Sequence, residues 1–192
     1  MPTTTLTPHQ AARAAVDETS WATTVVDFEH HELHSGDAFH ASGTVDLAAS
    51  GTVICLFRTP NTTKWCHVIP VVTSEVETAA TWYEGFAVGT AHGGTVGTSV
   101  IAKNRNRNSS TAAGATVYSG ATVGTASPGT SGSVLQQWHW GSGRDVGGEA
   151  RGVTEWIGKQ NTWYMLEIIN QSASAANYVT WQFEWYEHTD NE

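Results

Sequence analysis

Residues 178–187 read YVTWQFEWYE, and this stretch decides the fold. Large apolar and smaller polar side chains alternate along it, which is the pattern of an extended strand with one face in a core. The apolar face holds Val179, Trp181, Phe183 and Trp185, and the opposite face holds Thr180, Gln182 and Glu184. We therefore predict a β-strand whose aromatic face lies in the protein interior.

Similar stretches continue outward through most of the chain. They are rich in β-branched and aromatic residues and are separated by turn-forming residues, as at 35–37, 50–51 and 141–143. The predicted strands span 21–28, 38–47, 53–58, 65–73, 76–86, 98–101, 115–118, 134–140, 152–157 and 164–170. Because no helix of crossover length lies between them, we expect an all-β, antiparallel β-sandwich of jelly-roll type.

The chain has the size of one domain. Its 192 residues, of which 40% are hydrophobic, are enough for a sizeable core. Residues 11–16 favour a helix that is too short to be stable alone. We expect a short N-terminal arm over 1–17, followed by a single β-sandwich domain over 18–192. Gly and Thr dominate from about residue 87 to residue 133, which predicts loops and short strands there.

Charge excludes some classes of partner. The 18 acidic residues outnumber the nine Lys and Arg and give a formal net charge of -9, which argues against a nucleic-acid partner. No stretch approaches the ~18 consecutive apolar residues of a membrane span. The first residues, MPTTT, lack the basic and apolar regions of a signal peptide. We expect a soluble protein, made in the cytoplasm, with no membrane partner.

Two cysteines flank the turn at 59–62, which reads as a hairpin. Cys55 and Cys66 could face each other across this turn. We favour two reduced, buried thiols over a disulfide, because the sequence carries no export signal. No C-x-x-C pair is present to support a zinc site.

The stretch EHHELH at 29–34 is the obvious metal candidate. Its imidazoles, His30, His31 and His34, are ligand types suited to Zn²⁺ or Ni²⁺. The spacing departs from H-E-x-x-H, because His34 comes one residue too early after His31, and Ser35-Gly36 then ends any helix. We interpret the stretch as a polar strand end and turn at a subunit contact, and expect neither metal nor cofactor.

No pattern of catalytic residues stands out. There is no G-x-S-x-G elbow, and neither cysteine lies in a known nucleophile signature. The carboxylate pairs Glu149 with Glu155 and Glu184 with Glu187 stay open for glycoside cleavage, because their spatial separation decides that chemistry. We expect a protein that is not an enzyme.

Basic residues gather in two short runs. In KNRNRN at 103–108, an extended strand would place Lys103, Arg105 and Arg107 on one side. The Gly-rich loop at 143–151 carries Arg144 and Arg151 but lacks the P-loop pattern. On an acidic protein, such runs favour pairing with carboxylates of a neighbouring subunit or partner.

Tryptophan is abundant, with nine in the chain. Those toward the C-terminus could form a sugar-stacking platform, but we favour core or interface positions for them. They are Trp138, Trp140, Trp156, Trp163, Trp181 and Trp185.

Several motifs together resemble a family of small structural proteins of tailed-bacteriophage virions. The similarity runs from about residue 27 to residue 189. It rests on DFEHHELHSG at 27–36, TPNTTKW at 59–65, NRNRNS at 104–109, GGEAR at 147–151, KQNT at 159–162 and WYEHT at 185–189.

The resemblance implies a β-sandwich that decorates and cements an icosahedral capsid, on the outer surface of the virion. It implies binding to the major capsid protein and to neighbouring copies, in a homo-oligomer that is a trimer or a dimer, and it carries over no catalytic residues. We expect Pro8 and Arg13 of the arm, and Arg105, Arg107, Arg144 and Arg151, to contact these partners. The alternative is a glycan-binding module of a head fibre or the tail.

Overall fold

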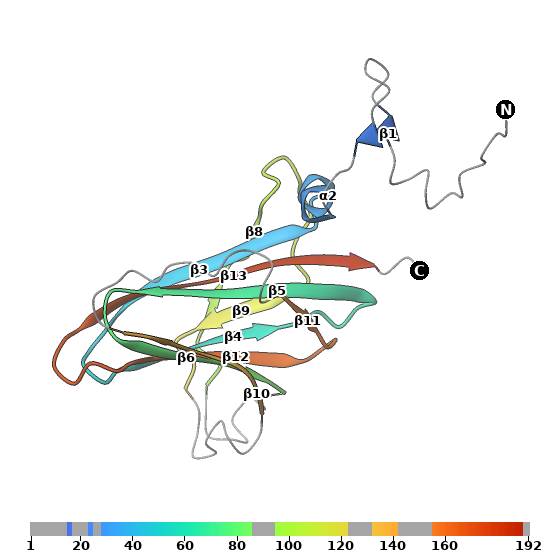
Figure 1. Ribbon diagram of the computed structural model, residues 1–192. Helices are drawn as coiled ribbons and strands as arrows, with labels where there is room; N and C mark the ends of the chain where they lie inside the picture. Colours follow the sequence, from blue (N-terminus) through green and yellow to red (C-terminus); the bar gives the residue numbers. More distant parts are fainter. Residues whose placement is uncertain are drawn as a thin grey trace, which may run out of the picture.

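The computed structural model describes residues 15–16, 23–24, 28–85, 95–122, 132–141 and 155–189, with side chains from residue 31 onward (Figure 1). Its first elements are β1 (Ala15–Val16), β2 (Thr23–Thr24) and the helix α2 (Phe28–Ser35). The strands that follow are β3 (Ala38–Leu47), β4 (Thr52–Arg58), β5 (Lys64–Ser74), β6 (Thr78–Glu84), β7 (Thr98–Val100), β8 (Lys103–Asn104), β9 (Thr116–Ser119), β10 (Ser133–Trp140), β11 (Trp156–Gly158), β12 (Trp163–Asn170) and β13 (Asn177–Thr189).

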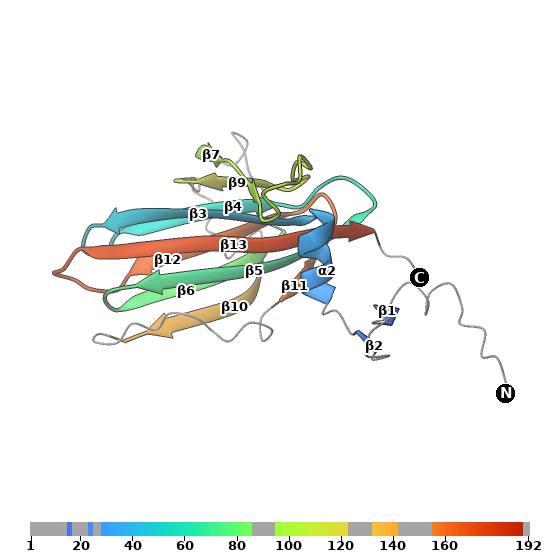
Figure 2. The same cartoon turned by 90° about the horizontal axis from the view of Figure 1, so that it is seen from above.

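Two antiparallel sheets pack face to face as a β-sandwich (Figures 1 and 2). The six-stranded sheet has the order β10-β6-β12-β4-β9-β7, and the five-stranded sheet has the order β11-β5-β13-β3-β8. The predicted all-β sandwich is therefore confirmed. β1 and β2 pair with each other, and Figure 1 draws β1 outside the two sheets, beyond α2.

The main core lies between the sheets, and β13 supplies its centre. Val179, Trp181, Phe183 and Trp185 are all buried, as their alternation predicts. From the opposite sheet, Phe57 packs edge-on against Trp185 with ring centroids 5.2 Å apart. A smaller cluster, Ile54, Leu56, Tyr83, Ala121 and Met165, covers the other face of the six-stranded sheet, so β4 is buried on both sides.

The predicted hairpin at 59–62 is wrong. β4 and β5, which the segment connects, lie in different sheets, so it crosses from one sheet to the other. Both strands have a buried apolar face, and placing them in opposite sheets lets these faces meet in one core.

Cys55 and Cys66 therefore contribute to the core from opposite sheets. Both are free thiols and are buried. Burial raises the pKa of the Cys55 thiol to about 12 and also raises the pKa of the Cys66 thiol, where the Glu187 carboxylate adds to the effect. Such thiols stay protonated and pack as small apolar groups.

The predicted strand at 21–28 is wrong at its end, because Phe28 begins α2. A Schellman motif ends this helix: the amide of Gly36 donates to the carbonyl of Leu33, and the amide of Asp37 donates to that of Glu32. Gly36 takes the left-handed conformation that the motif requires, with φ of 84°. The helical tendency expected for 11–16 also gives way at Ala15–Val16, where the backbone is β1.

The segment 95–122 closes one side of the sandwich. β9 extends the six-stranded sheet beyond β4, and β7 pairs with β9. β8 adds to the five-stranded sheet beside β3. Within the described residues, no helix has the length and apolar character needed to cross a membrane.

Candidate functional site

Several features meet at the end of the sandwich where β3 and β5 begin and β13 finishes; we call it the α2 end. There the amide of Glu187 donates to the carbonyl of Asp37, and the ammonium of Lys64 lies 2.7 Å from the Asp37 carboxylate. Figure 1 shows α2 beside the end of β13. His67, near the start of β5, pairs with Tyr186, near the end of β13. Paired residues point to the same side of a sheet, so both side chains lie on the outer face of the five-stranded sheet.

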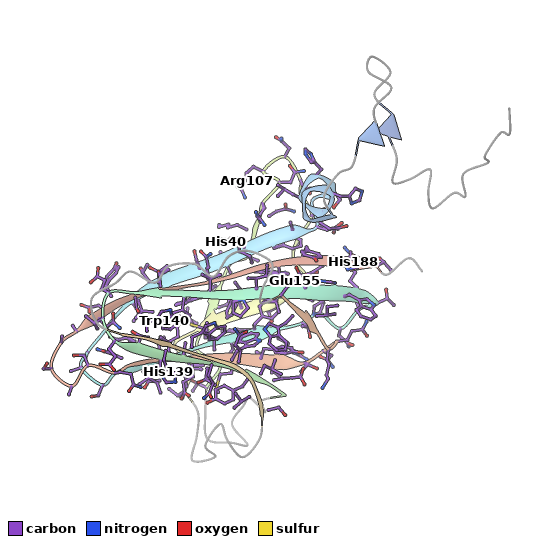
Figure 3. The ribbon with its side chains drawn as sticks, in the orientation of Figure 1. His40, Arg107, His139, Trp140, Glu155 and His188 are labelled. Carbon is purple, nitrogen blue, oxygen red and sulfur yellow. The ribbon has the colours of Figure 1, made fainter. Side chains whose placement is uncertain are left out.

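Four polar side chains form a contiguous group on this outer face: His67, Glu155, Tyr186 and His188. We call them the imidazole cluster. Tyr186 Oη donates to Glu155 Oε1 at 2.6 Å and lies 2.9 Å from His67 Nδ1. The His67 ring stacks on the Tyr186 ring, with centroids 4.5 Å apart and planes at 18°. Figure 3 draws Glu155 and His188 close to the finish of β13.

The contacts of the two imidazoles indicate which ring nitrogens carry a hydrogen. His67 Nδ1 bonds to the Glu155 carboxylate, which only accepts when ionised, so this nitrogen carries a hydrogen. His188 Nδ1 faces the backbone oxygen of Thr189 at 3.4 Å and also carries one. The two Nε2 atoms face one another at 2.9 Å.

Exposed apolar side chains flank the imidazole cluster. Trp65, on β5, is 43% exposed, and Ile157, which pairs with His67 in the ladder, is 53% exposed. The His67 side chain between them is only 12% exposed. Exposed apolar side chains beside hydrogen-bonding groups form a surface that can bind a protein or a sugar ring.

Two of the predicted partner-binding arginines also lie at the α2 end. The chain leaves β8 after Asn104, so the run at 103–108 is not one extended strand, and the one-sided arrangement of Lys103, Arg105 and Arg107 that such a strand would give does not apply. Arg105 Nη1 lies 3.7 Å from the Glu184 carboxylate of the same chain. Arg107 donates to the carbonyl of Asn104 and remains exposed. Pro8, Arg13, Arg144 and Arg151 lie outside the described residues.

The histidines at 30–34 lie on α2 rather than at a strand end. His31 is exposed and contacts the Glu32 carboxylate at 3.3 Å, and His34 is also exposed. The side chain of His30 lies outside the described part. Among described side chains, no group of three or more His, Cys, Asp and Glu is placed to hold a metal.

Neither candidate carboxylate pair is seen as a pair in the structure. Glu184 and Glu187 lie on opposite faces of β13, since the first shares the outer face with Gln182 and the second is buried on the core side. Glu187 is instead structural: its oxygens accept from the amides of Gly114 and Ala115 and from Trp185 Nε1. Glu149 lies outside the described residues, and Glu155 belongs to the imidazole cluster.

Most of the singled-out tryptophans serve the core. Trp181 and Trp185 are buried, and Trp138, Trp140 and Trp156 are half-buried and pack against the same core. Trp163 packs on the smaller cluster. Among the tryptophans whose side chains are described, Trp65 is the most exposed, and the predicted tryptophan set omits it.

One pocket of about 270 Å³ lies beside β7, β8 and β9, away from the imidazole cluster. Phe39, Val100, Ala113 and Val117 are among its lining residues, and Asn104 also lines it. The Asn104 amide group already donates to the carbonyls of Gly36 and Thr111, so it is engaged in holding the loop.

The sequence did not reveal the imidazole cluster, because its members come from β5, from β13 and from the residue that precedes β11. Tyr186 and His188 are two residues apart and so share a face of β13, a signal that was present in the alternation. His67 and Glu155 join them only through the ladders of β5 with β13 and with β11. No family model, curated protein or solved structure matches this chain.

Proposed function

We propose that this chain is a structural protein of a tailed-bacteriophage virion that decorates and cements the icosahedral capsid, without enzymatic activity. The observation that carries the proposal is the strand order of the two sheets, which supports a jelly roll. Jelly rolls are frequent in viral capsid proteins, so the step from this fold to a virion role is an analogy. The motif resemblance points to the same class.

The pairing of the strands supports the jelly roll in detail. Eight strands remain when β1, β2 and the three strands of the segment 95–122 are set aside. Among these eight, the first pairs with the last, β3 with β13, and the second with the next to last, β4 with β12. The series continues inward with β5 and β11, and with β6 and β10. A long antiparallel ribbon wound into two sheets produces this nested order.

The α2 end is the surface we propose for docking. It brings together the exposed Trp65, the imidazole cluster and the loop that carries Arg105 and Arg107, whose neighbour Asn106 donates to the carbonyl of His34. An aromatic anchor with arginines nearby is the composition that carries binding energy in protein interfaces. The arm over 1–17 precedes α2 in the chain, and α2 lies at this end of the sandwich.

In this proposal the arm grips the major capsid protein or a neighbouring copy, and the subunits form trimers or dimers on the outer capsid surface after synthesis in the host cytoplasm. Many copies on a lattice make modest contacts per copy sufficient. A segment that orders on docking exchanges chain entropy for contacts.

The test is co-sedimentation with capsids that lack the protein. We expect deletion of residues 1–17 to abolish shell binding while the melting temperature stays unchanged. We expect Trp65→Ala to weaken shell binding. The control is Tyr178→Ala, which removes an exposed aromatic side chain from the same outer sheet face at the opposite end of β13 and should leave binding intact. A truncated protein that still decorates capsids overturns the role of the arm.

A second function, glycan binding by a head-fibre or tail module, is favoured by one observation. Trp65 is exposed beside the stacked rings of His67 and Tyr186, and aromatic faces bind sugar rings. Lectin domains also use jelly rolls. A glycan array separates the two: specific binding that is lost in Trp65→Ala supports this second function.

A further inference from the structure

The two imidazoles of the imidazole cluster are arranged as a pair of metal ligands. Their Nε2 atoms lie 2.9 Å apart and face one another. A metal ion bound about 2.0–2.1 Å from each nitrogen sets neighbouring nitrogens about 2.9 Å apart in square-planar geometry, which Cu²⁺ prefers, and about 3.3 Å apart in tetrahedral geometry, which Zn²⁺ prefers. Opening the pair by no more than about 0.4 Å is therefore enough to admit either ion between the rings. His188 lies next to Thr189, the exposed last residue of β13, where a side chain has room to shift.

The opposite nitrogen of each ring is already held. Glu155 accepts from His67 Nδ1, which is the carboxylate–histidine arrangement that orients metal-binding imidazoles and raises their basicity. The Thr189 carbonyl plays the same part for His188 Nδ1. Tyr186 stacks on His67 and fixes the plane of its ring. These contacts select the tautomers in which both Nε2 lone pairs are available to a cation.

The space between the two facing Nε2 atoms is the position of the ion. A metal ion there accepts one lone pair from each Nε2 atom, both Nδ1 hydrogens stay in place, and any proton held on Nε2 leaves to solvent. The Glu155 carboxylate remains beside the site and offsets part of the added charge. No other covalent or redox step is involved.

We infer that His67 and His188 form a binding site for one divalent transition-metal ion, with Glu155 and Tyr186 as positioning residues. Two imidazole ligands favour Cu²⁺ over Ni²⁺ and Zn²⁺ and do not suit Mg²⁺ or Ca²⁺, which prefer oxygen. Since the described side chains include no group of three or more ligands, the remaining positions are filled by water or by a donor from another molecule. This site is distinct from the histidines of α2.

The experiment uses the full chain purified without a histidine tag and stripped with chelator. Calorimetric titration with Cu²⁺, Ni²⁺ and Zn²⁺ measures stoichiometry, and imidazole nuclear magnetic resonance identifies the ligands. We expect one ion per chain, at least tenfold weaker binding in His67→Ala and in His188→Ala, and a loss of about tenfold in Glu155→Gln. Unchanged binding is expected in His40→Ala, an outer-face histidine on β3, and in the double variant His31→Ala with His34→Ala.

His188→Gln provides a second variant in case His67→Ala fails to fold, because His188 lies close to the end of its strand. Binding that survives in both His188 variants, binding lost only in the α2 double variant, or no binding of Cu²⁺ or Ni²⁺ by the folded protein each overturn the inference. The titration needs no capsid, so its failure leaves the proposed virion function standing.

Discussion

At the scale of single residues, buried polar groups hold the loops to the sheets. Glu187 is the clearest example: one carboxylate, 3% exposed, accepts from two loop amides and one indole. Asn170 does the same for another turn, donating to the carbonyls of Ala48 and Ala175. Neither role was predictable from sequence, because the loop amides that Glu187 accepts from, and Ala48 in the case of Asn170, are distant along the chain.

The variant Glu187→Gln tests the role of this carboxylate, which we call the Glu187 clamp because it holds the loop amides of Gly114 and Ala115 to β13. The amide places a donor among three donors and removes the charge, so we expect a loss of about 2–4 kcal/mol in the free energy of unfolding. Urea denaturation measures it. Glu184→Gln is the matched control, since its ion pair with Arg105 is partly exposed and worth under about 1 kcal/mol. Equal effects of the two variants contradict the clamp.

Gly36→Ala tests the end of α2. The residue has φ of 84°, and an added Cβ overlaps the Ser109 side chain, so both conformation and packing oppose the change. We expect a loss of about 2–4 kcal/mol, against about 1–2 kcal/mol for Gly120→Ala, where φ is 70° but no heavy atom lies within 4 Å of the new Cβ. Thermal unfolding of both variants gives the comparison. A smaller loss at Gly36 than at Gly120 removes the packing argument.

At the scale of elements, alternation located the strands but did not assign their partners. The prediction at 38–47 coincides with β3, and those at 53–58, 65–73, 134–140 and 164–170 match their strands to within a residue at each end. The hairpin predicted at 59–62 failed because a turn signal is the same whether the chain pairs back on itself or crosses to a facing sheet. The sheet to which each strand belongs distinguishes these cases, and β4 and β5 belong to different sheets.

Because β4 packs against β5, we expect both cysteine thiols to be unreactive in the folded chain. Because Cys55 and Cys66 are buried and their pKa values are raised, a thiol reagent at pH 8 should label neither in the folded chain. Labelling should follow the unfolding curve in urea and reach both thiols only in the unfolded state. Rapid labelling of native protein contradicts the described core.

At the scale of the whole molecule, the same groups make stability sensitive to alkali. The unfolded chain releases the thiol protons near the ordinary pKa of 9.0, whereas the folded chain keeps them, with Cys55 at about 12. Burial also raises the pKa of Tyr83 and Tyr164 above 10.0. Their contribution to stability is complete below pH 9 and is lost as pH rises above it.

We therefore expect the free energy of unfolding to fall above pH 9 by up to about 1.4 kcal/mol per pH unit for each thiol that ionises only when unfolded. Urea denaturation from pH 8 to pH 10.5 measures the slope, and Cys66→Ala should reduce it. A flat profile over this range contradicts the linkage.

The central claim is that the molecule is a shell-binding structural protein whose α2 end faces its partners. The most direct test is cryo-electron microscopy of virions from the genome that encodes this chain. The proposal predicts copies across the whole outer shell, with residues 1–17 and Trp65 against the capsid lattice or a neighbouring copy. Absence of the chain from the virion, or confinement to the tail, contradicts it.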